Sequence, residues 1–73
     1  MTSSLAATVA AEVRAEMGRQ QRSQEDLADV LGIARSVISL RLNGHRSFKL
    51  TEIELLADYF GVPITSLIRE RVA

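Results

Sequence analysis

Basic side chains gather in one segment near the middle of this 73-residue chain, although the formal net charge of the chain is zero. No acidic residue lies between Val30 and Thr51, while the nine acidic residues of the chain all precede or follow that segment. The segment carries four cations and the single histidine, namely Arg35, Arg41, His45, Arg46 and Lys49. A stripe of guanidinium and ammonium groups attracts phosphates, so the pattern indicates a nucleic-acid partner. A chance clustering of four basic residues is the competing interpretation.

The chain lacks the residue patterns that catalysis or metal binding requires. There is no cysteine, and no nucleophile or orienting acid accompanies His45 in the nearby sequence. No glycine-rich phosphate loop, zinc-ligand spacing or pair of catalytic carboxylates is present. We therefore expect no enzyme activity, no cofactor and no metal site, and we place His45 in a loop near phosphates.

Length and composition predict one folded domain that spans residues 1–73. Hydrophobic residues make up 47% of the chain and charged residues 25%, as in ordinary globular proteins. The lack of cysteine fits a reducing cytosol. The apolar runs are too short to span a membrane, and residues 1–10 lack the pattern of a secretion signal. We expect a cytoplasmic protein that does not associate with membranes.

Apolar spacing and capping residues predict an all-α chain of five helices, with no stretch that alternates as a strand would. Ser3 or Ser4 can cap the first helix, and Gly18 is expected to end it. Ser23 suits the N-cap of the second helix, with Asp26 completing a capping box, and Gly32 suits its C-terminal end.

The last two helices have their own boundary signals. Thr51 and Glu54 form a capping box for the fourth helix, and Pro63 suits the first turn of the fifth. Between the third and fourth helices, Phe48 and Leu50 are expected to reach inward from a loop. The five expected helices cover about residues 5–17, 24–31, 35–42, 52–60 and 64–71.

The stretch "SQEDLADVLGIARSVISLRLNG", residues 23–44, has the features of a helix-turn-helix. Two short helices are joined by a tight turn whose pivot is Gly32, and Ala28 is small where the helices cross. Leu27, Leu31 and Ile38 close the angle between them. In such a unit the first helix supports the second, so that the second can enter a major groove of DNA.

The chain resembles the helix-turn-helix domain of phage Cro proteins and lambda-type repressors, including many small bacterial regulators. The matching residues are Gln24, Leu27-Ala28, Leu31-Gly32, Ile38-Ser39, Asn43-Gly44, Leu56-Ala57, Phe60-Gly61-Val62 and Leu67. The resemblance covers about residues 23–68 and implies a compact five-helix lambda-repressor-like domain that binds double-stranded DNA.

The resemblance implies a role for each exposed position around the third helix. The outward face of that helix would meet base edges through Arg35, Ser36, Ser39 and Leu40. Phosphates would be contacted by Gln24, Asn43, His45, Arg46, Ser47 and Lys49. Arg35 is the best candidate for a bidentate contact with guanine, with a phosphate contact as its alternative. Gln24 has the simpler alternative of an exposed polar residue.

Three positions depart from the family or from simple amphipathicity. Ala34 stands where the family often has a serine or threonine cap, and Leu40 points outward where a polar residue is expected. Arg41 stands where the family usually has an apolar core residue. We expect Arg41 to lay its stem on the core and to pair with Glu52 or Glu54, in preference to a DNA phosphate.

The resulting functional hypothesis is a sequence-specific transcriptional regulator, similar to Cro, that represses by covering a promoter. Two copies are expected on a roughly palindromic site with half-sites about 10 bp apart. The last helix is the candidate dimer surface, although its side chains can equally close the monomer core: Leu67, Ile68 and Val72. A monomer that pairs only on DNA is a further option. The rival hypothesis is an antitoxin-like module that uses the same fold to bind another protein.

Overall fold

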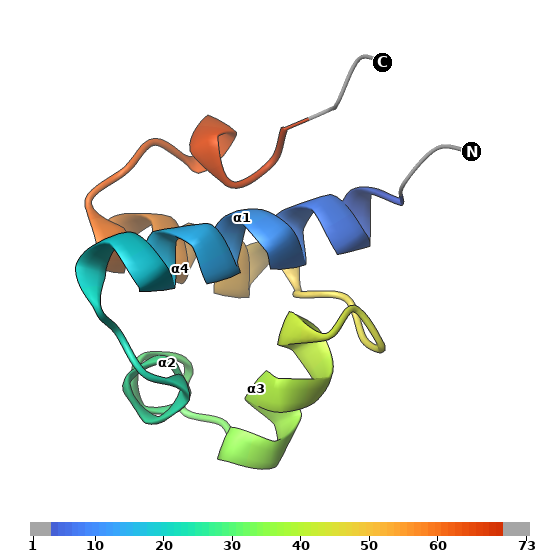
Figure 1. Cartoon of the computed structure of the whole chain (residues 1–73), viewed down its shortest axis with the longest axis vertical. Coiled ribbons are helices and arrows are strands. Elements are labelled where there is room, and N and C mark those ends of the chain that lie inside the picture. The colour runs from blue at the N-terminus through green and yellow to red at the C-terminus, as the bar shows by residue number, and fades with distance from the viewer. Residues whose placement is uncertain (1–3, 70–73) are drawn as a thin grey trace.

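The computed structural model describes residues 4–69, which form four α-helices and one short 3₁₀ turn joined by tight connections (Figure 1). The elements are α1 (Leu5–Gln20), α2 (Gln24–Leu31), α3 (Arg35–Leu42), α4 (Leu50–Phe60) and η1 (Ile64–Ser66). The all-α fold class is confirmed, and the bounds of α2 and α3 agree with those expected from the sequence. In Figure 1, α2 and α3 lie on one side of α1, and η1 lies on the other.

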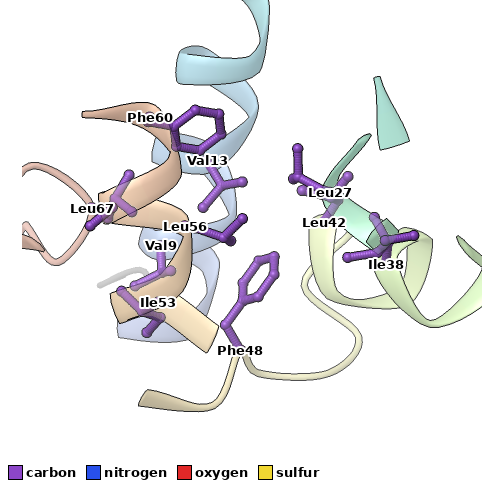
Figure 2. Packing of buried hydrophobic residues seen from close by; sticks show 12 residues of the cluster. Val9, Val13, Leu27, Ile38, Leu42, Phe48, Ile53, Leu56, Phe60 and Leu67 are labelled. Carbon is purple, nitrogen blue, oxygen red and sulfur yellow. The ribbon is translucent and has the colours of Figure 1, made fainter. Parts of the chain in front are cut away.

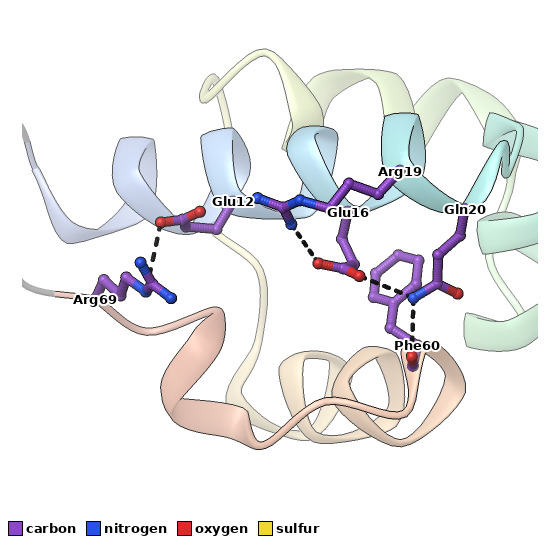
Figure 3. A network of polar contacts seen from close by, with 6 residues as sticks. All are labelled: Glu12, Glu16, Arg19, Gln20, Phe60 and Arg69. Atoms are coloured by element: carbon purple, nitrogen blue, oxygen red, sulfur yellow. Dashed lines mark hydrogen bonds and ion pairs between the residues drawn. The ribbon is translucent and has the colours of Figure 1, made fainter.

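The first helix continues past Gly18, where the sequence predicted its end. Ser4 caps its start by accepting a hydrogen bond from the Ala7 backbone at 3.1 Å. Glycine weakens a helix by about 1 kcal/mol, but here the last turn has a tertiary anchor. The Gln20 side chain donates to the Phe60 carbonyl at 2.9 Å and to Glu16 at 2.8 Å (Figure 3). The helix ends instead at Gln20, and its C-cap Gln21 takes the left-handed conformation with φ 55°.

The fourth helix begins at Leu50, two residues before the expected start, so the predicted Thr51–Glu54 capping box is wrong. The Glu52 carboxylate accepts from the Lys49 backbone N–H at 2.8 Å, which makes Lys49 the N-cap. Thr51 therefore lies inside the helix and is exposed. Leu50 is 63% exposed and does not reach inward, whereas Phe48 is buried as expected.

The prediction of a fifth helix at residues 64–71 is also wrong for the part of it that the structure describes. Only Ile64–Ser66 are helical, as a single 3₁₀ turn. Leu67 follows it with its backbone N–H bonded to Ile64 at 2.9 Å and its side chain in the core. Residues 70 and 71 of the expected helix lie outside the described part of the chain.

The core is one cluster to which every helix contributes (Figure 2). Its most enclosed side chains, all less than 2% exposed, come from four different elements and the C-terminal segment: Val13, Leu27, Ile38, Leu56 and Leu67. The same apolar residues that define the helix-turn-helix pattern thus hold α2 and α3 against α1 and α4. This packing fixes which face of α3 points outward.

Candidate nucleic-acid interface

The turn between α2 and α3 has the geometry of a helix-turn-helix. Gly32 takes the left-handed conformation, φ 66°, and its N–H bonds to the Ala28 carbonyl. Ile33 donates to the same carbonyl at 3.1 Å, which closes the turn. Leu27 and Ile38 are fully buried at the junction. The expected pivot at Gly32 is therefore confirmed, and α3 is held in one orientation on α2.

A complete capping box fixes the start of α2. Ser23 accepts from the Asp26 backbone at 3.1 Å, and the Asp26 carboxylate accepts from the Ser23 backbone at 2.8 Å. The hydrogen bond that the Ser23 backbone N–H donates to the carboxylate, together with the nearby Ser23 hydroxyl, lowers the pKa of Asp26 below its usual value of 3.8. Gln24, the expected phosphate-binding residue, is the first residue of this helix and is half-buried.

The outward face of α3 carries the expected base-reading residues. Arg35 and Ser36 are exposed, Leu40 is 41% exposed, and Ser39 is half-buried. Ala34 is the N-cap and provides no side-chain hydrogen bond, as its residue type implies. The first turn of α3 therefore presents backbone N–H groups without a side-chain cap. Such groups suit a negatively charged ligand.

Arg41 points away from that face and is almost completely enclosed. Its side chain is 11% exposed, and its Nε lies 3.2 Å from Oε1 of Glu52, whose side chain is 9% exposed. One terminal nitrogen also donates to the Ser47 carbonyl at 3.1 Å. The Nε–H is close to the carboxylate but is not aligned for a hydrogen bond. The expectation of an ion pair is confirmed, and Glu52 rather than Glu54 is the partner.

The segment from Asn43 to Lys49 follows α3 directly, and we call it the DNA-facing loop after the role predicted for it from the sequence. It contains five of the expected phosphate-binding residues, all exposed: Asn43, His45, Arg46, Ser47 and Lys49. The backbone N–H groups of His45 and Arg46 donate to the Leu40 carbonyl at 3.0 and 3.3 Å. Phe48 is 7% exposed and anchors the loop in the core. The loop is thus continuous with the outward face of α3.

Two acidic residues from outside the basic segment lie against its arginines. Glu25, in the first turn of α2, has its carboxylate 3.4 Å from the Arg35 guanidinium, and Glu52 pairs with Arg41. Among residues 4–69, Arg46 and Lys49 form no ion pair. The stripe read from the sequence as four cations is therefore two cations and two ion pairs in space. Sequence spacing hides this, because Glu25 and Arg35 lie ten positions apart in the chain.

Arg14 of α1 is a contributor that the sequence did not indicate. Its guanidinium donates to the carbonyl of Leu42, at the C-terminus of α3, across 28 positions of sequence. A cation at the C-terminus of a helix satisfies a free carbonyl and opposes the helix dipole. Arg14 therefore ties the end of α3 to α1.

The candidate dimer residues have separate locations. Leu67 is 1% exposed and belongs to the monomer core, so it is not available as a surface. Ile68 is half-buried, and Val72 lies outside the described residues. Ile68 lines a hollow of about 320 Å³ with Leu5, Phe48 and Leu50. Leu5 and Leu50 are 54% and 63% exposed at this hollow.

Two further observations concern the described residues alone. No helix between residues 4 and 69 is long and apolar enough to cross a membrane. In the same range, no three His, Cys, Asp or Glu side chains lie close enough together to hold a metal ion.

Comparison with known proteins places this geometry in a family. The helix-turn-helix family matches residues 11–67, a range that includes the turn and both of its helices. The chain therefore belongs to the helix-turn-helix family.

A solved structure shows the same arrangement of helices. It is described as a hypothetical transcription factor, NHTF, from Neisseria, and superimposes with a TM-score of 0.81 at 28% sequence identity. The match covers 92% of this chain and 77% of that one. No curated protein matches the chain.

Proposed function

We propose that the chain is a sequence-specific transcriptional regulator that binds double-stranded DNA in the cytoplasm and acts by binding rather than by catalysis. The observation that carries this proposal is the position of α3. Its outward side presents Arg35, Ser36 and Leu40, while its other side is locked into the core through Ile38. A helix supported in this way enters a major groove and contacts base edges. The similarity to a structure described as a transcription factor supports the same conclusion.

The DNA-facing loop and α3 contact different parts of the DNA. Arg46 and Lys49 project from it without a protein counter-charge among the described residues, so they bind phosphates and set the register of the protein on the duplex. Arg35 binds guanine, exchanging the weak, exposed contact with Glu25 for two hydrogen bonds to O6 and N7. Repression follows from occupancy, as in Cro, because the bound protein covers a promoter.

Two copies bind a roughly palindromic operator with half-site centres about 10 bp apart. One copy presents only the outward face of the eight-residue helix α3 to the bases, and specific recognition generally buries more surface than one small module provides. The second copy sits on the hollow lined by Leu5, Leu50 and Ile68. Phe48 of the DNA-facing loop also lines it, so a partner there lies beside the loop on the same duplex.

Selection from random duplexes followed by footprinting tests the proposal directly. A symmetric protected site is expected, and failure to enrich any sequence would refute sequence-specific binding. A chain that selects no duplex but binds another protein would instead support the antitoxin-like alternative. For self-association, Leu50→Ser is expected to abolish dimers on DNA in sedimentation experiments. Leu55→Ser, at a 49% exposed leucine of α4 that does not line the hollow, is the matched control.

Two arginine variants test the division between reading and positioning. Arg35→Ala should cost about 1–3 kcal/mol of binding free energy and relax preference at one base pair. Arg46→Ala should weaken binding to all sequences alike and reduce the salt slope by about one. Identical behaviour of both variants across a panel of altered sites would contradict the assignment.

A further inference from the structure

We infer that Arg41 and Glu52 are positioning residues, whose buried ion pair holds the second half of the DNA-facing loop in the conformation that contacts the DNA backbone. The inference rests on the proposed function, because it assigns a role in DNA binding to two side chains that themselves face the protein interior.

The two halves of the loop are held in different ways. In the first half, the backbone N–H groups of His45 and Arg46 bond to the Leu40 carbonyl, so α3 itself fixes their place. From Ser47 to Lys49, two of the backbone groups bond to side chains, in addition to the Lys49 carbonyl, which accepts from the Ile53 N–H of α4 at 3.0 Å. Arg41 donates to the Ser47 carbonyl at 3.1 Å, and Glu52 accepts from the Lys49 N–H at 2.8 Å.

The ion pair joins these two anchors into one unit. Arg41 and Glu52 approach to 3.2 Å, so the residue holding Ser47 and the residue holding Lys49 are fixed to each other. Between them, Phe48 enters the core. Of the two exposed cations, Lys49 is itself one of the anchored residues, and Arg46 directly precedes the other anchored residue, Ser47. The Lys49 side chain therefore starts from a backbone group that Glu52 holds, and Arg41 fixes the residue that directly follows Arg46.

Burial argues that this pair does more than stabilise the monomer. Both side chains are about nine-tenths buried, and removing two charges from water costs free energy that their attraction rarely exceeds. Because the Arg41 Nε–H is not aligned for a hydrogen bond, the ion pair regains even less of that free energy. Replacement of such a pair by apolar residues of similar size is often neutral or stabilising. The contribution that apolar residues cannot replace is the pair of hydrogen bonds to the loop.

The test is Arg41→Met combined with Glu52→Met, assayed by urea unfolding and by binding to a random-sequence duplex over a range of salt. We expect the urea midpoint to change little, because loss of the Glu52 cap on α4 opposes the gain from removing two buried charges. Duplex affinity should fall about tenfold, and the salt slope should fall by about one for each cation that loses its place. A random-sequence duplex suffices, since phosphate contacts do not depend on sequence.

The matched control is Glu12→Met combined with Arg69→Met. It also removes one arginine and one glutamate, whose side chains lie 3.9 Å apart on the opposite side of α1 from α2 and α3 (Figures 1 and 3). Duplex binding by this control is expected to match the wild type. Equal affinity and salt slope for both double variants would overturn the inference.

A second pair of variants decides the question if the Met–Met protein does not fold. Glu52→Gln removes a negative charge beside the DNA-facing loop, as Glu54→Gln does at an exposed position of the same helix. Electrostatics alone predicts stronger duplex binding for both variants. Our inference predicts weaker binding for Glu52→Gln, because the unpaired Arg41 guanidinium leaves its buried site and releases Ser47. Stronger binding by Glu52→Gln would refute it.

The same assays separate this inference from the proposed function. A wild-type protein that binds no duplex, even at low salt, would contradict DNA binding itself. A wild-type protein that binds duplex while the Arg41 and Glu52 variants bind equally well would contradict only the positioning role.

Discussion

Two leucines on opposite sides of the helix-turn-helix should give opposite results when each is replaced by alanine. Leu27 of α2 is completely buried, whereas Leu40 of α3 is 41% exposed on the outward face. Leu27→Ala leaves a cavity between α2, α3 and the rest of the core, and truncations of this kind cost about 3–5 kcal/mol. A chain of this length has a total stability of about 4–11 kcal/mol, so the loss is a large fraction of it. Leu40→Ala should change stability by less than about 0.5 kcal/mol.

Urea unfolding and duplex binding together measure this contrast. With an m-value of about 1 kcal/mol/M for a small protein, Leu27→Ala should lower the midpoint by about 3 M. Its folded fraction should still bind DNA with unchanged affinity. Leu40→Ala should keep the wild-type midpoint and bind a selected site about fivefold more weakly where a thymine methyl contacts the leucine. The rotation assigned to α3 is wrong if Leu40→Ala unfolds as easily as Leu27→Ala, or if it binds every selected site normally.

Three further predictions concern the glycines, Asp26 and Glu25. Gly32→Ala should destabilise the protein by about 1 kcal/mol, because Gly32 has φ 66°. Gly18→Ala should stabilise it by about the same amount, because Gly18 is an exposed helical position with open space around it. The two variants should therefore shift the thermal midpoint in opposite directions. Because Ser23 lowers the pKa of Asp26, the stability that Asp26 adds is present above pH 3.8 and is lost as the pH falls through the lowered pKa of the folded state. Unfolding measured over a range of acidic pH should therefore show the stabilities of wild type and Asp26→Asn converging at low pH. Glu25→Gln should raise affinity for random duplex, since it removes a negative charge next to Arg35, while the thermal midpoint stays nearly constant; unchanged affinity would place Glu25 away from the DNA.

The helix-turn-helix itself was predictable because its boundary signals are local. The Ser23–Asp26 capping box joins residues three positions apart, and Gly32 ends α2 through its own backbone conformation. Of the boundaries that were wrong, the start of α4 depends on the local Lys49–Glu52 hydrogen bond, which lysine as a residue type does not signal, whereas the end of α1 depends on a distant contact. The end of α1 is held by the Phe60 carbonyl, forty residues from Gln20, and no pattern near Gly18 reveals that bond.

The same distinction separates the predictable and unpredictable parts of the site. Helical spacing alone places Leu40 outward and Arg41 against the core, because the apolar face defined by Ile38 and Leu42 fixes the rotation of α3. The partner of Arg41 was harder to assign, since it depends on where α4 begins. The start at Leu50 brings Glu52 to the third helical position, where it both caps Lys49 and meets Arg41.

The ion pairs of Arg35 and Arg41 also predict how strongly DNA binding depends on salt. Of the six residues expected to contact phosphates, only Arg46 and Lys49 carry a full charge at neutral pH with histidine uncharged. Each neutralised phosphate contributes about −0.9 to the slope of log K against log salt concentration, so two copies should give about −4. If Arg35 and Arg41 also served as phosphate ligands, the slope for two copies would be about −7.

Measuring duplex affinity between about 50 and 200 mM salt separates these values, because the corresponding losses of affinity differ by more than an order of magnitude. A slope near −7 would mean that Arg41 leaves Glu52 and that Arg35 binds the backbone on the DNA complex. A slope near −4 would assign the affinity for phosphates to the loop and leave α3 to recognise bases. In that case high affinity for an operator depends on base contacts and on dimerisation of the protein, because two cations per copy provide only weak non-specific binding.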